Sequence, residues 1–497
     1  MNRKMVFYTC GRLMQVTAAL LLLPAVTALI YGEYGPMNSF IAVAAAAFLL
    51  GTLISKLMRS GNTVIYAREG FAVVGLAWLL MSAIGALPFV LTGDIPNYID
   101  AFFETVSGFT TTGSSIITNV EALSKSALLW RSFTHWVGGM GVLVFVMAIM
   151  SNVSDRSIHI MRAEMPGPAV GKLLPRVRDT AKVLYLIYIV ITAAEVILLR
   201  LGGMSLYESL LHSFGTAGTG GLAIRADSIA GYSPYCQTVI AVFMMLFGIN
   251  FNLYYLILIG RARSALKSTE LWVYLGIITT ATAVITVNIS ALYPSFGEAL
   301  RHAYFQVSSI TTTTGYSTAD FNLWPGLSKA LLFALMFLGG CAGSTAGGLK
   351  MSRAILLGKL SLREIKKLLH PRSVTTVNFE GKEVDDRTLS GVATYFGAYV
   401  FVIMATFLLV SFEPFGFESN FTAAVACFNN IGPGFAAVGP MGGFAGYTVF
   451  SKLVFSVAML LGRLEIFPLL IAVSPSVWRG RGATEKYPAE TQKNAAA

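Results

Sequence analysis

Ten apolar runs constrain this chain more than any other feature of its sequence. Each is long enough to cross the hydrocarbon core of a bilayer, which is about 30 Å thick. They lie at residues 11–31, 38–58, 71–92, 133–150, 183–202, 236–259, 271–291, 328–349, 391–411 and 449–473. Only 12% of the 497 residues are charged, which is about half the fraction found in soluble domains. We therefore expect an all-α polytopic membrane protein with ten spans, and we exclude a soluble enzyme.

The basic residues are distributed as the positive-inside rule requires. If both termini are cytoplasmic, the inner segments hold 28 of the 36 Lys and Arg residues. Those segments are residues 1–12, 52–70, 151–182, 260–270, 350–388 and 474–497. We therefore expect both termini in the cytoplasm. The net charge of +11 reflects this orientation in the membrane, and we predict no nucleic-acid partner.

After the first two spans, the chain repeats one unit four times: an apolar span, an outer stretch that is too apolar for an ordinary loop, and a second span. Each outer stretch contains a fourteen-residue block. The blocks read FFETVSGFTTTGSS (102–115), SLLHSFGTAGTGGL (209–222), YFQVSSITTTTGYS (304–317) and FTAAVACFNNIGPG (421–434). Aligned without gaps, they share a glycine at the twelfth position: Gly113, Gly220, Gly315 and Gly432.

Each block begins with helix-compatible apolar residues and ends in small residues, and it is too short to cross a bilayer. It can enter the membrane as a half-helix and return as an extended strand. Such a backbone is tolerated at membrane depth only where it is buried in protein or lines a water-filled cavity. Four related segments around one axis could replace the hydration shell of a cation with their carbonyls. The alternatives are Gly/Thr-rich outer loops or close helix packing through small residues.

The repeats also divide the chain into segments. We predict a leading two-helix unit (1–65), repeat 1 (66–160), repeat 2 (161–265), repeat 3 (266–370), repeat 4 (371–478) and a polar cytoplasmic tail (479–497). Repeat 3 contains a broken inner helix and a basic cytoplasmic segment.

These blocks, in this arrangement, resemble the Trk/Ktr/HKT superfamily of potassium transporters. Within it, the chain looks like the bacterial Trk-type subunit, because two spans precede the first repeat. The resemblance implies one four-repeat pore per subunit, in a bacterial inner membrane, and K⁺ as the transported ion. Members with serine at the first filter glycine tend toward sodium, so Gly113 implies potassium. The implied filter residues are Thr111, Thr112, Gly113, Thr219, Gly220, Thr313, Thr314, Gly315, Asn430, Ile431 and Gly432.

The inner helix of the third repeat contains five glycines among residues 339–348. Each costs roughly 1 kcal/mol of helix propensity, so we expect the helix to open into a loop there. In the resembling family, this position carries a gate below the filter. A close helix–helix contact is the alternative, and a Walker A loop is excluded because Leu349 interrupts that motif. The predicted gate residues are Gly339, Gly340, Gly343, Gly347, Gly348, Lys350 and Arg463.

Arg463 is a charge in the middle of a predicted span, where charged residues usually face the protein interior or a cavity. It could form an electrostatic barrier in the pore or a partner for the gate loop. A structural ion pair with Glu195 or Glu465 is the third possibility. The resemblance favours a pore-facing arginine near the loop.

The basic segment 350–388 has apolar residues at helical spacing, which is typical of a helix lying on membrane lipid or docking a partner. Trk-type subunits resemble one another in forming homodimers on a cytosolic ring of TrkA-like subunits that bind NAD or another nucleotide. This chain carries no G-x-G-x-x-G motif after a strand, so nucleotide control would come from another polypeptide.

We therefore predict potassium uptake, either channel-like or coupled to protons or sodium; the sequence does not decide which. Two alternatives belong to other classes. A sodium- or proton-coupled solute symporter would favour inverted repeats, whereas these four run in one orientation. A membrane-embedded enzyme would need clustered catalytic side chains, and the predicted spans contain only isolated Glu195, Arg463 and Glu465.

Overall fold

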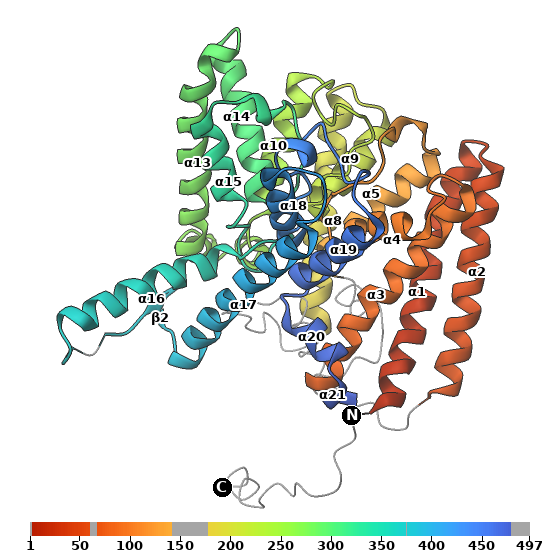
Figure 1. The fold of residues 1–497 in the computed structure, drawn as a ribbon, viewed down its shortest axis with the longest axis horizontal. Coiled ribbons are helices and arrows are strands. Elements are labelled where there is room, and N and C mark those ends of the chain that lie inside the picture. Colours follow the sequence, from red (N-terminus) through yellow and green to blue (C-terminus); the bar gives the residue numbers. More distant parts are fainter. Residues whose placement is uncertain (1, 60–66, 142–176, 374, 479–497) are drawn as a thin grey trace, which may run out of the picture.

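The computed structural model describes residues 2–59, 67–141, 177–373 and 375–478. Several predictions fall outside these residues: the second half of the span 133–150, most of the inner segment 151–182, the first two repeat boundaries and the tail 479–497. The described chain is almost entirely helical (Figure 1). It contains six helices of membrane-spanning length and composition, or eight if each of two bent helix pairs counts as one span.

Two leading helices, α1 (Arg3–Ile30) and α2 (Tyr34–Leu57), form an antiparallel pair at one side of the molecule (Figure 1). Small residues let their backbones approach closely. A Cβ atom on Gly51 would lie 2.5 Å from the carbonyl oxygen of Gly11. The pair therefore packs through glycine, and α1 also contacts α3 and α5 of the main bundle.

The main bundle consists of four units, each with a long helix, a short helix and a second helix. The first unit comprises α3 (Ala67–Thr92), α4 (Tyr98–Phe109) and α5 (Lys125–Gly139), and the second comprises α8 (Val177–Leu201), α9 (Leu206–Gly218) and α10 (Pro234–Phe247). The third unit comprises α13 (Thr269–Ile289), α14 (Phe296–Thr311) and α15 (Gly326–Leu335). The fourth comprises α17 (Asp386–Val410), α18 (Phe417–Asn429) and α19 (Val449–Arg463). The short helices have 12 to 16 residues, so they reach only about 18–24 Å.

Each short helix carries an acidic residue in its first turn. These residues are Asp100, Glu208, Glu298 and Glu418. A carboxylate there stabilises the positive end of the helix dipole. Ser205 and Glu208 form a complete capping box at the start of α9. The C-terminal ends of the four helices, which carry the partial negative charge of the dipole, lie beside the segments that follow them.

Three of the second helices, α10, α15 and α19, stop or bend sharply at their C-terminal ends. α10 continues into α11 (Phe251–Leu258) at an angle of 89°, and α19 continues into α20 (Phe467–Val473) at 119°. α15 ends at Leu335, followed by a turn over 336–338. The third inner helix therefore opens as expected, but before Gly339. The sequence marks both places with polar residues: Asn250 and Asn252 interrupt the apolar run 236–259, and Arg463 and Glu465 interrupt the run 449–473. The sharp change of helix direction at each place was not predicted.

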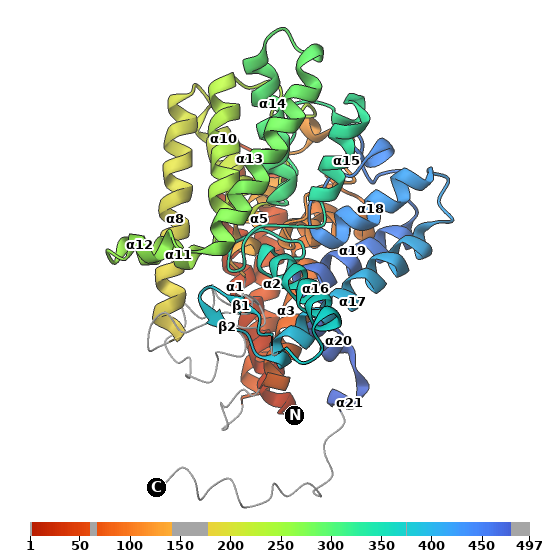
Figure 2. The ribbon, with the colours of Figure 1, turned by 90° about the vertical axis from the view of Figure 1, so that its left-hand side faces the viewer.

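Further elements lie on one end of the bundle or in its connections. α16 (Met351–Leu369) extends from the bundle and is followed by a hairpin of β1 (Asn378–Phe379) and β2 (Lys382–Glu383) beside it (Figure 2). This hairpin is the exception to the all-α prediction within the described residues. The remaining short elements are η1 (Val120–Ala122), α12 (Ala262–Ala265), η3 (Ser290–Leu292), η4 (Phe321–Leu323), η5 (Ala436–Val438) and α21 (Pro475–Trp478).

Candidate functional site: a closed ring of four carbonyls

The four short helices end in the same backbone geometry. In each, one N–H donates to the carbonyl five residues earlier at 2.8–3.0 Å, and the preceding residue is left-handed, with φ of 55–57°. The N–H groups belong to Thr112, Gly220, Thr314 and Ile431, and the left-handed residues are Thr111, Thr219, Thr313 and Asn430. The four units thus have matching helix ends, although the residue types differ.

This geometry corrects the gap-free alignment of the second block. Glycines with positive φ follow each left-handed residue at a distance of two: Gly113, Gly221, Gly315 and Gly432. Gly221, not Gly220, therefore stands at the position of Gly113, and Gly220 matches Thr112. The second block was aligned one residue out of register because two adjacent glycines offered the same letter at the twelfth position. We call Gly113, Gly221, Gly315 and Gly432 the ring glycines.

Each ring glycine lies against a carbonyl of the next unit. A Cβ atom on Gly113 would lie 2.0 Å from the Gly220 oxygen. One on Gly221 would lie 2.0 Å from the Thr314 oxygen, and one on Gly315 would lie 2.1 Å from the Ile431 oxygen. One on Gly432 would lie 2.9 Å from the Thr112 oxygen, so the fourth unit returns to the first. These contacts form a closed ring, and side chains have no room at the first three positions.

All four ring glycines line one outer cavity of about 460 Å³. Two arginines also line it, and each is neutralised by a carboxylate. Arg131 is buried and pairs with buried Glu104 at 2.8 Å, while the more exposed Arg225 pairs with Glu208 at 2.8 Å. Both arginines that line the cavity are therefore paired with a carboxylate, and neither adds an unpaired positive charge beside the ring.

The Glu208 carboxylate stays ionised at neutral pH. Partial burial opposes ionisation, but hydrogen bonds from Ser205, Arg225 and Tyr232 lower the pKa of Glu208 to about 2. The pair with Arg225 therefore persists across the physiological pH range.

Side chains behind the ring fix its strands. The Thr112 hydroxyl lies 2.7 Å from the Thr110 hydroxyl and accepts a hydrogen bond from the Asn430 amide at 2.9 Å. His135 joins the first two units: its Nδ1 lies 2.8 Å from the Gly108 carbonyl, and its Nε2 accepts the Leu222 N–H at 3.3 Å. This arrangement needs the proton on Nδ1, so His135 is a neutral residue that ties the first two units together.

The loop between α15 and α16, which we call the inner loop (residues 336–350), lies directly against the ring strands. The Thr219 hydroxyl donates to the Thr345 carbonyl at 3.0 Å. The Gly347 N–H donates to the Thr313 hydroxyl at 2.6 Å, and a Cβ atom on Gly347 would lie 2.5 Å from the Asn429 oxygen. The inner loop therefore contacts three of the four units beside their left-handed residues.

Other predicted gate residues hold the inner loop together. Gly339 and Gly348 lie against each other, since a Cβ atom on Gly348 would lie 2.9 Å from the Gly339 Cα. Cβ atoms on Gly340 and Gly343 would lie 2.7 Å from the Ala346 Cβ and 3.0 Å from the Asn250 amide oxygen. These short distances explain why glycine occupies the turns of this loop.

Arg463 connects the inner loop to the first unit. Its guanidinium donates to the Thr345 carbonyl at 2.8 Å and to the Gly138 and Gly139 carbonyls at 2.7 and 2.6 Å. Arg463 therefore contacts both the inner loop and the end of α5 through backbone carbonyls. Glu465, one of the two ion-pair partners considered for Arg463, pairs with Arg353.

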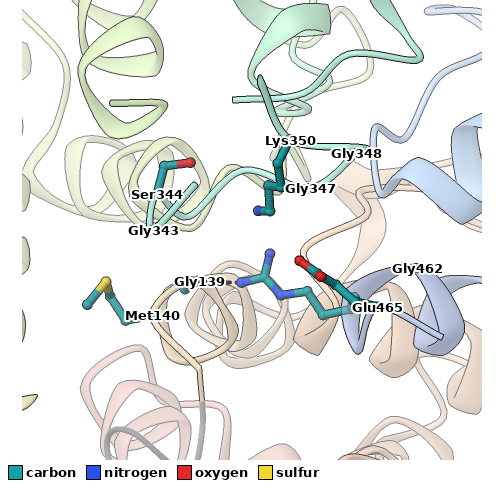
Figure 3. A pocket seen from close by; sticks show the side chains of 10 residues that line it. Gly139, Met140, Gly343, Ser344, Gly347, Gly348, Lys350, Gly462 and Glu465 are labelled. Atoms are coloured by element: carbon teal, nitrogen blue, oxygen red, sulfur yellow. Dashed lines mark hydrogen bonds between the residues drawn. The ribbon is translucent and has the colours of Figure 1, made fainter. Parts of the chain in front are cut away.

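Beside Arg463 lies a small cavity of about 30 Å³ (Figure 3). Lys350 and Glu465 reach into it from different sides, and Gly343, Ser344 and Gly347 of the inner loop form another wall. The Lys350 ammonium donates to the Ala346 carbonyl within the same loop. All the predicted gate residues therefore lie in or against the inner loop.

Backbone and hydroxyl oxygens are the ligands available at this site. Across the described ranges, no group of three or more His, Cys, Asp or Glu side chains could hold a metal ion. The sequence missed Gly221. The left-handed residue that sets the register, Thr219, is visible only in the structure, so the sequence carried no signal that could choose Gly221 over Gly220.

Comparisons with known proteins cover nearly the whole chain. The sequence model of the TrkH family, described as a cation transport protein, matches residues 36–479. The Trk system potassium uptake protein TrkH of Salmonella typhimurium is 35% identical over 477 residues, which cover 94% of this chain and 98% of that protein. The corresponding TrkG of Escherichia coli strain K12 is 33% identical over 485 residues, which cover 96% of this chain and 99% of that protein.

A solved structure gives the same result. The crystal structure of the potassium transporter TrkH from Vibrio parahaemolyticus matches this fold with a TM-score of 0.86 and 32% sequence identity. The match covers 96% of this chain and 100% of that structure.

Proposed function

Because the chain belongs to the TrkH family of cation transport proteins, we propose that it takes up potassium across a bacterial inner membrane through the ring described above. Family membership and the apolar helices make it a multi-pass membrane transport protein and not an enzyme. Potassium is the transported ion of Trk transporters and therefore a substrate, not a resident cofactor. An organic-solute symporter is not favoured by these relatives.

The closed contact between ring glycines and neighbouring carbonyls carries this proposal. Carbonyl oxygens can replace the hydration shell of a potassium ion, and the Thr112, Gly220, Thr314 and Ile431 carbonyls are the four that the ring glycines meet. The short helices also direct their C-terminal ends to these strands, and that end of a helix dipole favours a cation. The proposed filter therefore consists of the predicted residues, with Gly221 added.

We assign ten spans to the complete chain, with the four units as repeats and both termini in the cytoplasm. The support is the distribution of basic residues and the matching helix ends of the four units. With this orientation, the outer cavity opens to the outside, and the inner loop lies on the cytoplasmic side of the ring.

The inner loop is the proposed gate. It donates to or accepts from ring residues Thr219 and Thr313, and Arg463 fastens it to the first unit. A loop bonded at these points blocks the path below the ring until those bonds break. Arg463 then acts as a latch, by which we mean a side chain that holds the loop to the first unit by hydrogen bonds, and not as an isolated charge in the pore.

The proposed partners are a second copy of the chain, membrane lipid and a cytosolic TrkA-like ring that binds NAD or another nucleotide. The support is the family resemblance, together with the exposed apolar residues on basic α16, among them Leu362, Ile365 and Leu368. Such a helix can lie on lipid or contact a cytosolic protein. Channel-like conduction and coupling to protons or sodium both fit this assembly.

The test of the filter is Gly113→Ser. A side chain there would press against the Gly220 carbonyl, which a Cβ atom would approach to 2.0 Å. We expect a marked fall in the K⁺/Na⁺ flux ratio of the protein reconstituted in liposomes. An unchanged ratio in a folded variant would overturn the filter assignment.

A further inference from the structure

One buried carboxylate closes the inner loop at its base. Glu270 lies in the first turn of α13 and is 5% exposed. Its Oε1 atom accepts the Ala342 N–H at 2.8 Å and the Ser352 N–H at 2.9 Å. Ala342 stands near the start of the glycine-rich part of the inner loop, and Ser352 follows the end of the loop. A single oxygen atom therefore ties the middle of the inner loop to the start of α16.

Two backbone N–H groups share this one acceptor atom. Loss of the acceptor would leave both donors without a partner at the same time, and a buried unsatisfied donor is costly. Ser352 lies in the first turn of α16, where free N–H groups and the helix dipole favour a negative charge. Glu270 thus stabilises the start of α16 and the loop that precedes it.

A second carboxylate positions the helix end that carries Glu270. Glu380 stands at the turn of the β1–β2 hairpin, with φ of 50°. Its Oε1 atom accepts the Glu270 N–H at 3.0 Å and the Ser268 hydroxyl at 3.0 Å. The hairpin therefore caps the start of α13 through Glu380. Glu380 contacts Glu270, and Glu270 in turn binds the inner loop; we call this contact of Glu270 with Ala342 and Ser352 the clamp.

The hairpin is itself packed on α16. Phe379 and Val377 share an apolar cluster with Leu356, and the Lys359 ammonium donates to the Asn378 carbonyl at 2.7 Å. Figure 2 shows the hairpin beside α16. Glu380 is exposed there, so an event at the surface can reach it.

We propose that Glu270 is a positioning residue that holds the inner loop closed, and that the hairpin controls it through Glu380. A displacement of the hairpin removes the cap from the start of α13, shifts Glu270 and releases the Ala342 and Ser352 N–H groups. This proposal rests on the inner loop being the gate. It adds the route by which a change at the cytoplasmic surface reaches that gate.

The test measures Rb⁺ flux into liposomes for Glu270→Gln, Glu380→Gln and the double variant. Glutamine keeps the size of the side chain but replaces the carboxyl group by an amide, whose NH₂ group cannot accept a backbone N–H. We expect Glu270→Gln to raise the flux about tenfold, because an amide is a weaker acceptor than a carboxylate and releases the Ala342 and Ser352 N–H groups more readily. Glu380→Gln should raise it by a smaller factor. The matched control is Glu383→Gln, an exposed glutamate on the same hairpin, which should leave flux unchanged.

The double variant tests the order of the two residues. If Glu380 acts through Glu270, the double variant has the flux of Glu270→Gln alone. If the increase in flux of the double variant equals the product of the two single increases, the residues act independently, and the route through Glu380 is overturned. Unchanged or reduced flux in folded Glu270→Gln would overturn the clamp. If that variant fails to fold, surface variant Glu380→Gln decides: flux equal to that of Glu383→Gln contradicts the proposal.

A second measurement reports the loop directly. Cys341 is a buried cysteine of the inner loop, and the other three, Cys10, Cys236 and Cys427, can be replaced by alanine. The limiting rate of thiol modification at high pH should rise in Glu270→Gln together with flux. The K⁺/Na⁺ flux ratio of the unaltered protein separates failure of the proposed filter from failure of this proposal. Equal K⁺ and Na⁺ flux counts against the filter. A K⁺-selective flux together with an unchanged rate of Cys341 modification in Glu270→Gln counts against the role of Glu270 alone.

Discussion

Gly432 has more room beside its neighbouring carbonyl than the other ring glycines. A Cβ atom there would lie 2.9 Å from the Thr112 oxygen, whereas one on Gly221 would lie 2.0 Å from the Thr314 oxygen. Both residues have positive φ, so alanine costs about 1–2 kcal/mol of backbone strain at either position. The difference between them is therefore the displacement of a ring carbonyl.

We accordingly expect Gly221→Ala to lower the K⁺/Na⁺ flux ratio more than Gly432→Ala. The measurement is cation flux for both variants, with their thermal stability as the control for folding. Equal effects would mean that the spacing between units does not decide selectivity.

The two arginines of the outer cavity differ in burial, and this predicts different costs of removal. Arg131→Gln breaks a buried pair with Glu104, and breaking such a pair costs about 3–5 kcal/mol. Arg225→Gln breaks a pair whose arginine side chain is 39% exposed, which costs less than about 1 kcal/mol. Thermal unfolding in detergent should therefore show a large loss for the first variant only. Similar losses would contradict the role of burial.

At the scale of elements, Arg463 distinguishes a latch from an electrostatic barrier. A latch needs the planar fork of donors that reaches the Thr345, Gly138 and Gly139 carbonyls, and lysine does not reproduce that fork. We expect both Arg463→Gln and Arg463→Lys to raise K⁺ flux, the former about tenfold. A barrier would keep flux low in Arg463→Lys, because the charge remains. Flux in liposomes with matched protein content decides between them.

The elements were predictable from the sequence where a local pattern specifies them. Apolar runs locate the long helices, and the block letters locate the ends of the short ones. The bends after Phe247 and Arg463 were not predicted, because the polar residues there, Asn250, Asn252 and Glu465, indicate an interruption of the apolar run but not the direction of the helix that follows. The register of the second block was also not predictable, since helix-end geometry chooses between Gly220 and Gly221 and their letters are the same.

At the scale of the whole molecule, the site depends on contacts between distant parts of the chain. The ring closes between the first and fourth units through Gly432 and Thr112, and Glu270 meets the inner loop across more than seventy residues of sequence. Neither contact leaves a local pattern. The sequence could therefore indicate the four blocks and the glycine-rich loop, but not which neighbours hold them in place.

The most direct test of a potassium path is cation flux into liposomes that contain the purified protein alone. Gradients of K⁺, Rb⁺, Cs⁺ and Na⁺ should be compared under the same conditions. A ring of carbonyls that replaces the hydration shell of potassium predicts K⁺ and Rb⁺ flux well above Na⁺ flux. Equal flux for all four cations would contradict it.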